Sequence, residues 1–137
     1  MKSLFKSVAV FAVIALAAPL ARAEDDVPNI NKRGDNEKAF VEKLASTIVR
    51  NAHTTVKTAT LESYEKKEPK AGRTEWLIKA GYKGAIVGTK YTADIVVMLD
   101  TSDKDKWEVL RIEYTDNNKL TFSRKNVDGL VPKLNGK

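Results

Sequence analysis

The chain contains no cysteine, a single histidine and ten aromatic residues among its 137 residues. Without cysteine there can be no disulfide, no thiolate nucleophile and no lipid-modified cysteine behind an export signal. A zinc site with His53 as its one nitrogen ligand would need mostly carboxylates, which is unusual. The Gly-x-Ser-x-Gly motif that presents a nucleophilic serine is also missing. We therefore expect no metal, no cofactor and no evident catalytic constellation.

Long apolar runs are absent except near the start of the chain, where one has the features of a signal peptide. Two early lysines give a positive start, an apolar run covers residues 8–20, and Ala21 and Ala23 occupy the small-residue positions of a cleavage site. The alternative, a transmembrane anchor, needs about 20 apolar residues, and this run is shorter. We expect residues 1–23 to be a signal peptide. The mature chain, periplasmic or secreted and with no membrane span, would begin at Glu24.

The net charge gives no reason to expect a nucleic-acid partner. Three basic residues would leave with the signal peptide, so the 24 basic residues fall to 21 against 18 acidic ones, and the net charge falls from +6 to +3. A surface that mixes both signs at this level is ordinary for a soluble domain. The remaining 114 residues are enough for one domain that folds on its own core.

An amphipathic helix is predicted over residues 35–53, behind a polar leader over residues 24–34 that we expect to be flexible. Asp35 offers an N-cap, and Glu37 in the first turn suits the helix dipole. Apolar residues recur at spacings of three and four and form one stripe: Phe40, Val41, Leu44, Ile48, Val49, Ala52 and Val56. His53, at the end of the helix, is interpreted as a structural residue.

After the helix the apolar pattern changes to a period of two, which is typical of half-buried strands. Strands are expected at residues 57–65, 74–83, 91–100 and 107–115, with a short fifth strand at 120–122. The segment 91–100 alternates most regularly, so we place it in the middle of an antiparallel sheet. The segment 57–65 has few apolar residues and suits an edge. Residues 66–72 are expected to form a charged turn, and the apolar tail 127–134 to pack back on the domain.

The fourth expected strand has two apolar groups that point in opposite directions. Leu110, Ile112 and Tyr114 share one face, whereas Trp107 and Val109 face the other way. A β-bulge between the two groups would reconcile them.

One helix followed by a meander buries its apolar surfaces if the sheet curves around the helix. We therefore expect a single α+β domain over residues 35–137, with one amphipathic helix packed on a curved antiparallel sheet of four to five strands. The order of elements over residues 35–122 resembles the cystatin-like or NTF2-like α+β roll. The Gln-x-Val-x-Gly loop of protease-inhibiting cystatins is not present in residues 66–72 or in residues 85–88. Protease inhibition is therefore not expected.

Two regions are candidates for binding. The first is the hairpin end around residues 84–90, where an apolar run lies between glycines at a place where a polar turn is ordinary. The candidate residues are Ala85, Ile86 and Val87, with Trp76, Tyr82 and Tyr91 as aromatic side chains that could line a small pocket. The second is the edge strand 57–65, to which another chain could add a strand. Burial of the loop and solvation of the edge are the simpler alternatives.

Two acidic features are candidates for chemistry. Asp94 lies in mid-strand, but the alternation places it with Thr92 on the solvent face. The acidic segment 100–105 lacks the glycine and the closing glutamate of a calcium loop, so it is interpreted as a solvated turn.

The sequence thus favours an exported binding or interaction module for a protein or a small ligand. A small NTF2-like enzyme with a single-carboxylate pocket, and a structural accessory of an envelope complex, are the alternatives.

Overall fold

The computed structural model describes residues 27–84, 88–118 and 121–137. The expected signal peptide, residues 1–23, and the apolar run Ala85–Val87 lie outside the described residues. The elements are a short 3-10 helix η3 (Ile30–Lys32), helix α2 (Glu37–Ala52), strands β1 (Ala59–Lys70), β2 (Arg73–Lys83), β3 (Lys90–Asp100) and β4 (Glu108–Asp116), and helix α3 (Arg124–Leu134).

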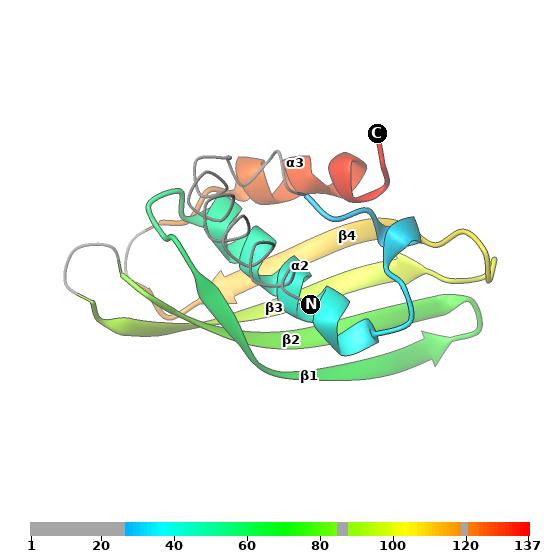
Figure 1. Ribbon diagram of the computed structural model, residues 1–137, viewed down its shortest axis with the longest axis horizontal. Helices are drawn as coiled ribbons and strands as arrows, with labels where there is room; N and C mark the ends of the chain where they lie inside the picture. The colour runs from blue at the N-terminus through cyan, green and yellow to red at the C-terminus, as the bar shows by residue number, and fades with distance from the viewer. Residues whose placement is uncertain (1–26, 85–87, 119–120) are drawn as a thin grey trace, which may run out of the picture.

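The four strands form one antiparallel meander in the order β1-β2-β3-β4. Both helices lie over the same face of this sheet, with α3 nearest to β4 (Figure 1). The predicted α+β class, the meander and the interior position of β3 are therefore confirmed. Within the described ranges, neither helix has the length and apolar character needed to cross a bilayer.

The core fills the space between the helices and the covered face of the sheet. Alternate residues of neighbouring strands face it in register, with Trp76 opposite Val97 and Ile78 opposite Ile95. The apolar stripe of α2 supplies the other side, and its buried members are Phe40, Val41, Leu44, Ala45, Ile48, Val49 and Ala52. The N-cap of α2 is Asn36 and not Asp35, so the helix begins one residue later than predicted. The Oδ1 of Asn36 accepts a hydrogen bond from the Ala39 amide at 3.0 Å.

Strand β1 is longer than expected, and the predicted turn over residues 66–72 is wrong. Lys66 and Lys67 lie in the strand, and the turn is confined to its end, where Gly72 has a φ of +78°. Charged residues are compatible with an edge strand because their side chains remain in solvent. Pro69 falls where the register between Lys67 and Lys70 is irregular, so its missing N–H disturbs no regular ladder.

A β-bulge is present in β4, and it regroups the apolar residues. Leu99 lies opposite Val109 and Met98 opposite Arg111, which leaves Leu110 as the extra residue. Val109 is thereby turned to the core, whereas Leu110 is 37% exposed. The expected grouping of Leu110 with the core residues of this strand is wrong.

The tail that was expected to pack back on the domain does so as a second helix, so the prediction of one helix is wrong. The Ser123 side chain caps α3 by accepting a hydrogen bond from the Asn126 amide at 3.2 Å. Val127, Leu130 and Leu134 are buried at spacings of three and four. The described part of the expected fifth strand, Thr121–Phe122, is not in a strand.

Residues 27–34, which we expected to belong to a flexible leader, are packed on the domain. Ile30 is fully buried. The side-chain amide of Asn31 bonds to both backbone groups of Trp107, at 3.2 Å and 2.8 Å. The Arg33 guanidinium stacks over the Trp107 ring, 3.6 Å from its centroid.

Candidate functional site

A cluster of polar side chains is buried where α2 ends. Asp116, the last residue of β4, lies opposite Ala93 on the face that is turned to the core, and its side chain is only 2% exposed. His53 caps the C-terminal end of α2 one turn beyond Val49 and extends the apolar stripe to the same point. The end of β4 and the end of α2 therefore meet at this cluster.

The Asp116 carboxylate is the centre of the cluster. Its Oδ2 accepts three hydrogen bonds, from His53 Nε2 at 2.7 Å, the Tyr82 hydroxyl at 2.8 Å and the Tyr114 hydroxyl at 2.9 Å. Its Oδ1 accepts one from the Asn118 amide at 3.0 Å. Because an ionised carboxylate can only accept, Nε2 of His53 carries the proton of that bond.

The environment shifts the pKa values of three of these groups. Burial by itself would raise the pKa of Asp116, but the hydrogen bonds from His53, Tyr82, Asn118 and Tyr114 outweigh it and leave that pKa below its ordinary value. Burial first, and then the hydrogen bond to Asp116, raise the pKa of Tyr114. Burial also raises the pKa of Tyr82. The arrangement thus holds an ionised carboxylate among protonated donors.

A carboxylate that orients a histidine is the pair used in general-base catalysis. Here His53 also stacks on the Tyr82 ring, with the centroids 5.4 Å apart, and its side chain is 7% exposed. Both members of the pair are enclosed by their partners, so the cluster ties α2, β2 and β4 together. The sequence predicts a structural role for His53, and the strand that it predicts over residues 107–115 ends one residue before Asp116. The alternation of Ile112, Tyr114 and Asp116 on one strand face was the signal that could have found it.

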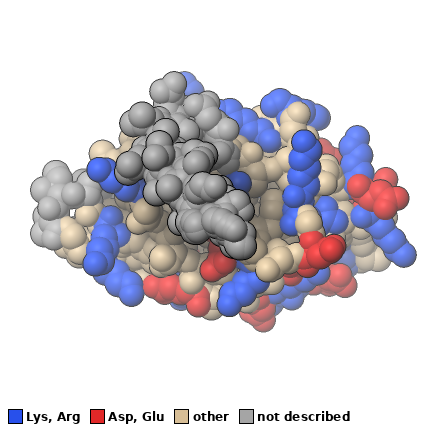
Figure 2. Space-filling view, in the orientation of Figure 1, with Lys and Arg blue, Asp and Glu red and all other residues tan. Residues whose placement is uncertain are grey.

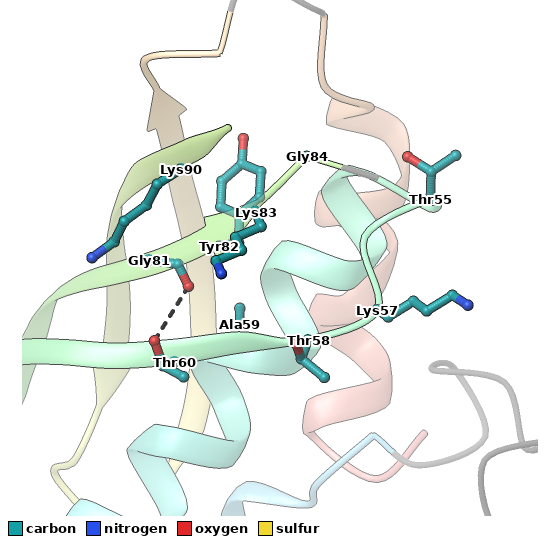
Figure 3. Close-up of a pocket in the computed structure, with 10 residues that line it drawn as sticks. All are labelled: Thr55, Lys57, Thr58, Ala59, Thr60, Gly81, Tyr82, Lys83, Gly84 and Lys90. Carbon is teal, nitrogen blue, oxygen red and sulfur yellow. Dashed lines mark hydrogen bonds between the residues drawn. The ribbon is translucent and has the colours of Figure 1, made fainter. Parts of the chain in front are cut away.

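A hollow of about 510 Å³ lies at the start of β1, beside the end of β2 and the start of β3 (Figure 3). Three lysines and three threonines contribute to its lining: Lys57, Lys83, Lys90, Thr55, Thr58 and Thr60. Figure 3 shows Lys57 and Lys90 extending to opposite sides, with Lys83 between them. Gly81 also lines the hollow, and a side chain there would collide with the Glu62 carboxylate.

The charge of this hollow differs from that of the surface around it. Basic and acidic side chains are mixed over the visible face of the molecule (Figure 2). In contrast, none of the described residues that line the hollow is acidic. Glu62 lies beside it, with Oε2 3.6 Å from Lys90 Nζ. Among the described residues, Lys57 and Lys83 form no ion pair, so two of the three lysines are not neutralised locally.

The structure separates the aromatic candidates. Tyr82 lines the hollow, and its hydroxyl belongs to the buried cluster. Tyr91 is half-buried beside it, with the ring centroids 5.5 Å apart. Trp76 lies near the other end of β2, fully buried between Phe40 and Trp107, and within the described chain its Nε1 has no hydrogen-bond partner. Ala85, Ile86 and Val87 are outside the described residues.

The remaining acidic candidates lie where the alternation placed them. Asp94 is exposed on the uncovered face, 3.6 Å from Lys79 Nζ. Asp100 begins a solvated turn and accepts hydrogen bonds from the amide and hydroxyl of Ser102, which lower its pKa. Over the part of the chain that the structure describes, no three His, Asp or Glu side chains gather so as to hold a metal ion.

Comparison with models of known families, with curated proteins and with solved structures found no match to this chain. The argument for function therefore starts from the geometry of the hollow and the cluster.

Proposed function

We propose that the chain is an exported binding module whose ligand lies in the hollow at the start of β1. One observation carries this proposal. The edge strand and the hairpin flank, which the sequence offered as separate binding regions, border the same hollow through Lys57–Thr60 and through Gly84 and Lys90. Its volume of about 510 Å³ falls in the range of small-molecule sites.

Export and fold family belong to the same proposal. The charged start, apolar run and small-residue cleavage site of residues 1–23 support export. A helix followed by a four-stranded meander supports a cystatin-like or NTF2-like roll, to which α3 would be an addition. Fold likeness alone carries no function, so the proposal depends on the hollow.

A second candidate is a protein partner that adds a strand to β1. Among the described residues, no side chain hydrogen-bonds to the backbone of β1, which forms one edge of the sheet. Edge strands with uncovered backbone groups can take up an extended segment of another chain. The bulge after Leu61 and the charged residues up to Lys70 work against such pairing, which makes the hollow the better site. A structural accessory of an envelope complex would use this same edge.

The enzyme alternative would depend on Asp116, which faces the helices from the inner side of the sheet. Its carboxylate accepts four hydrogen bonds and is nearly closed off from solvent. A substrate would have to displace at least one of these donors. The open hollow requires no such rearrangement, so binding is the function that the geometry favours.

Mapping by NMR tests the binding proposal. Amide chemical shifts of the exported form would be followed against a small set of neutral, cationic and anionic fragments. We expect saturable shifts at Thr58–Thr60 and Gly81–Gly84. Shifts that gather instead on the uncovered face around Leu77 and Val96 would contradict the proposal, as would the absence of any saturable site. Shifts along Ser63–Lys67 only on addition of extended peptides would favour strand addition.

A further inference from the structure

The ligand class of the hollow can be inferred from its donors, and this step rests on the proposed function. Every charged residue among the described lining residues is a lysine, and the hydroxyls of Thr55 and Thr58 can donate hydrogen bonds, whereas that of Thr60 donates to the Gly81 carbonyl at 3.5 Å. Lysines that line a concave surface raise the local concentration of anions. We infer that the hollow binds a small anion that carries a carboxylate or phosphate group.

The position of the lysines, rather than their lack of ion pairs, distinguishes the hollow. Exposed lysines elsewhere on the described surface, such as Lys38 and Lys133, also form no ion pair, but those of the hollow gather around one concave surface. Among the described residues, Glu62 is the acid that pairs with a lysine of the hollow, and it lies 3.6 Å from Lys90. Lys57 and Lys83 are left to an anion from solution.

The bulge in β1 explains why Glu62 does not fill the hollow. The register shifts between Leu61 and Ser63, so Glu62 is the extra residue, and its carboxylate lies over Gly81. Bulges often re-aim a side chain beside a functional site. Glu62 thereby holds Lys90 at the rim, and the space between β1 and Lys83 stays free of acidic groups.

The lysines extend apart in Figure 3, so an anion would contact more than one of them only after rotation of their side chains. A lysine amine sits on a flexible four-carbon stem and contacts an oxyanion as a point charge. A ligand with one anionic group at the Lys83 position and neutral parts toward Thr58 and Ala59 matches the arrangement.

The test is a titration with inorganic phosphate and with succinate, followed by the amide shifts of Thr58–Thr60 and Gly81–Gly84. Glycerol is the uncharged comparison. We expect saturable shifts with either anion, none with glycerol, and weakening as NaCl rises from about 50 mM to about 500 mM. Saturable binding of neutral fragments at the same amides without binding of either anion would overturn the anion assignment and leave the binding proposal intact. No saturable binding of any probe would overturn both.

Matched variants separate a local site from bulk charge. The double variant Lys57→Glu/Lys83→Glu should weaken anion binding at least about tenfold, because it replaces two donors by repelling groups. Lys104→Glu/Lys106→Glu changes the net charge equally in an exposed turn and should change the affinity less than about twofold. Equal losses in the two variants would overturn the site.

A vesicle experiment then distinguishes the source of the anion. Sedimentation with vesicles of phosphatidylglycerol and phosphatidylcholine, against phosphatidylcholine alone, reports on lipid headgroups. Binding to the anionic vesicles that is lost in Lys57→Glu/Lys83→Glu assigns the site to headgroups. Binding of free succinate or phosphate without vesicle binding assigns it to a soluble metabolite. Both results support an anion site.

Discussion

The two edges of the sheet differ in whether side chains form hydrogen bonds to their backbone. At the start of β4, Asn31 bonds to the N–H and C=O of Trp107, the residue before the strand, and Asn135 does the same for Val109 at 2.7 Å and 3.0 Å. A side-chain amide offers one acceptor and a donor, as a peptide group does, so each asparagine takes the place of a neighbouring strand. At β1, no described side chain covers the backbone, and residues Glu65–Lys70 are all exposed.

As a result, the backbone at the β4 edge is covered, whereas the backbone at the β1 edge is accessible. The segments before α2 and after α3 both attach to β4, through Asn31 and Asn135, and α3 covers the strand. Helix α2 packs on the covered face of β1, but along its outer edge the described part of β1 has charges, a bulge and Pro69, which discourage pairing without covering the backbone. The hollow lies at the start of β1, so the site proposed for binding borders the edge whose backbone no described side chain covers.

Asp116→Ala should have the largest effect on the β4 side. It leaves His53 Nε2 and the hydroxyls of Tyr82 and Tyr114 buried without their acceptor. We expect a loss of about 3–5 kcal/mol in the free energy of unfolding, measured by urea denaturation. The control Asp94→Ala removes an acid that is 62% exposed and should change stability by less than about 0.5 kcal/mol. Similar losses in the two variants would show that the cluster does not hold β4.

A matched pair of leucines compares the packing of the two edges. Leu130 belongs to α3, which packs on β4, and it is 1% exposed, whereas Leu61 of β1 is half-buried. Leu130→Ala should cost about 2–5 kcal/mol because it leaves a cavity. Leu61→Ala should cost less than about 1.5 kcal/mol because solvent and neighbouring side chains fill the space. Thermal denaturation of both variants measures the difference, and a larger loss at Leu61 would reverse the proposed contrast.

The sequence predicts the inner part of this fold better than its edges. Strands β2 and β3 are buried on one face along their whole length, so the period of two is clear and their limits come out within one residue. Strand β1 has few core residues beyond Leu61 and Tyr64. Its residues up to Lys70 are exposed and show no alternation of apolar residues from which the strand could be predicted. Helix α3 was missed because Gly129 and Pro132 interrupt its short apolar stripe.

The cluster and the hollow were less visible in the sequence, for different reasons. Asp116 and His53 are 63 residues apart, and only the sheet register brings them together. Lys83 and Lys90 could be recognised as flanking one hairpin, but Lys57 joins them only through the pairing of Ala59 with Tyr82. The bulge that places Glu62 over Gly81 has no marker in the sequence.

The pH dependence of stability follows from the lowered pKa of Asp116. Its folded-state pKa lies below the ordinary value of 3.8, so its contribution is present above that value and is lost as the pH falls through the folded value. The urea midpoint of the native chain should therefore fall steeply below about pH 4. Asp116→Asn should be less stable at pH 6 and show a shallower fall in acid. An unchanged slope in the variant would assign the acid sensitivity to other carboxyl groups.

The smallest expected effect tests the closure of β4 itself. Asn135→Ala removes the partners of the Val109 N–H and C=O and leaves the core contacts of Val109 in place. We expect a loss of about 1 kcal/mol, because water reaches the groups that the amide had covered. Hydrogen exchange at the Val109 amide should rise about fivefold to tenfold. Asn126→Ala, which loses one exposed hydrogen bond to Asn51, is the control and should leave that amide unchanged. If Val109 exchanges at the same rate in Asn135→Ala, α3 rather than the asparagine protects this edge, and the proposed contrast between the two edges is wrong.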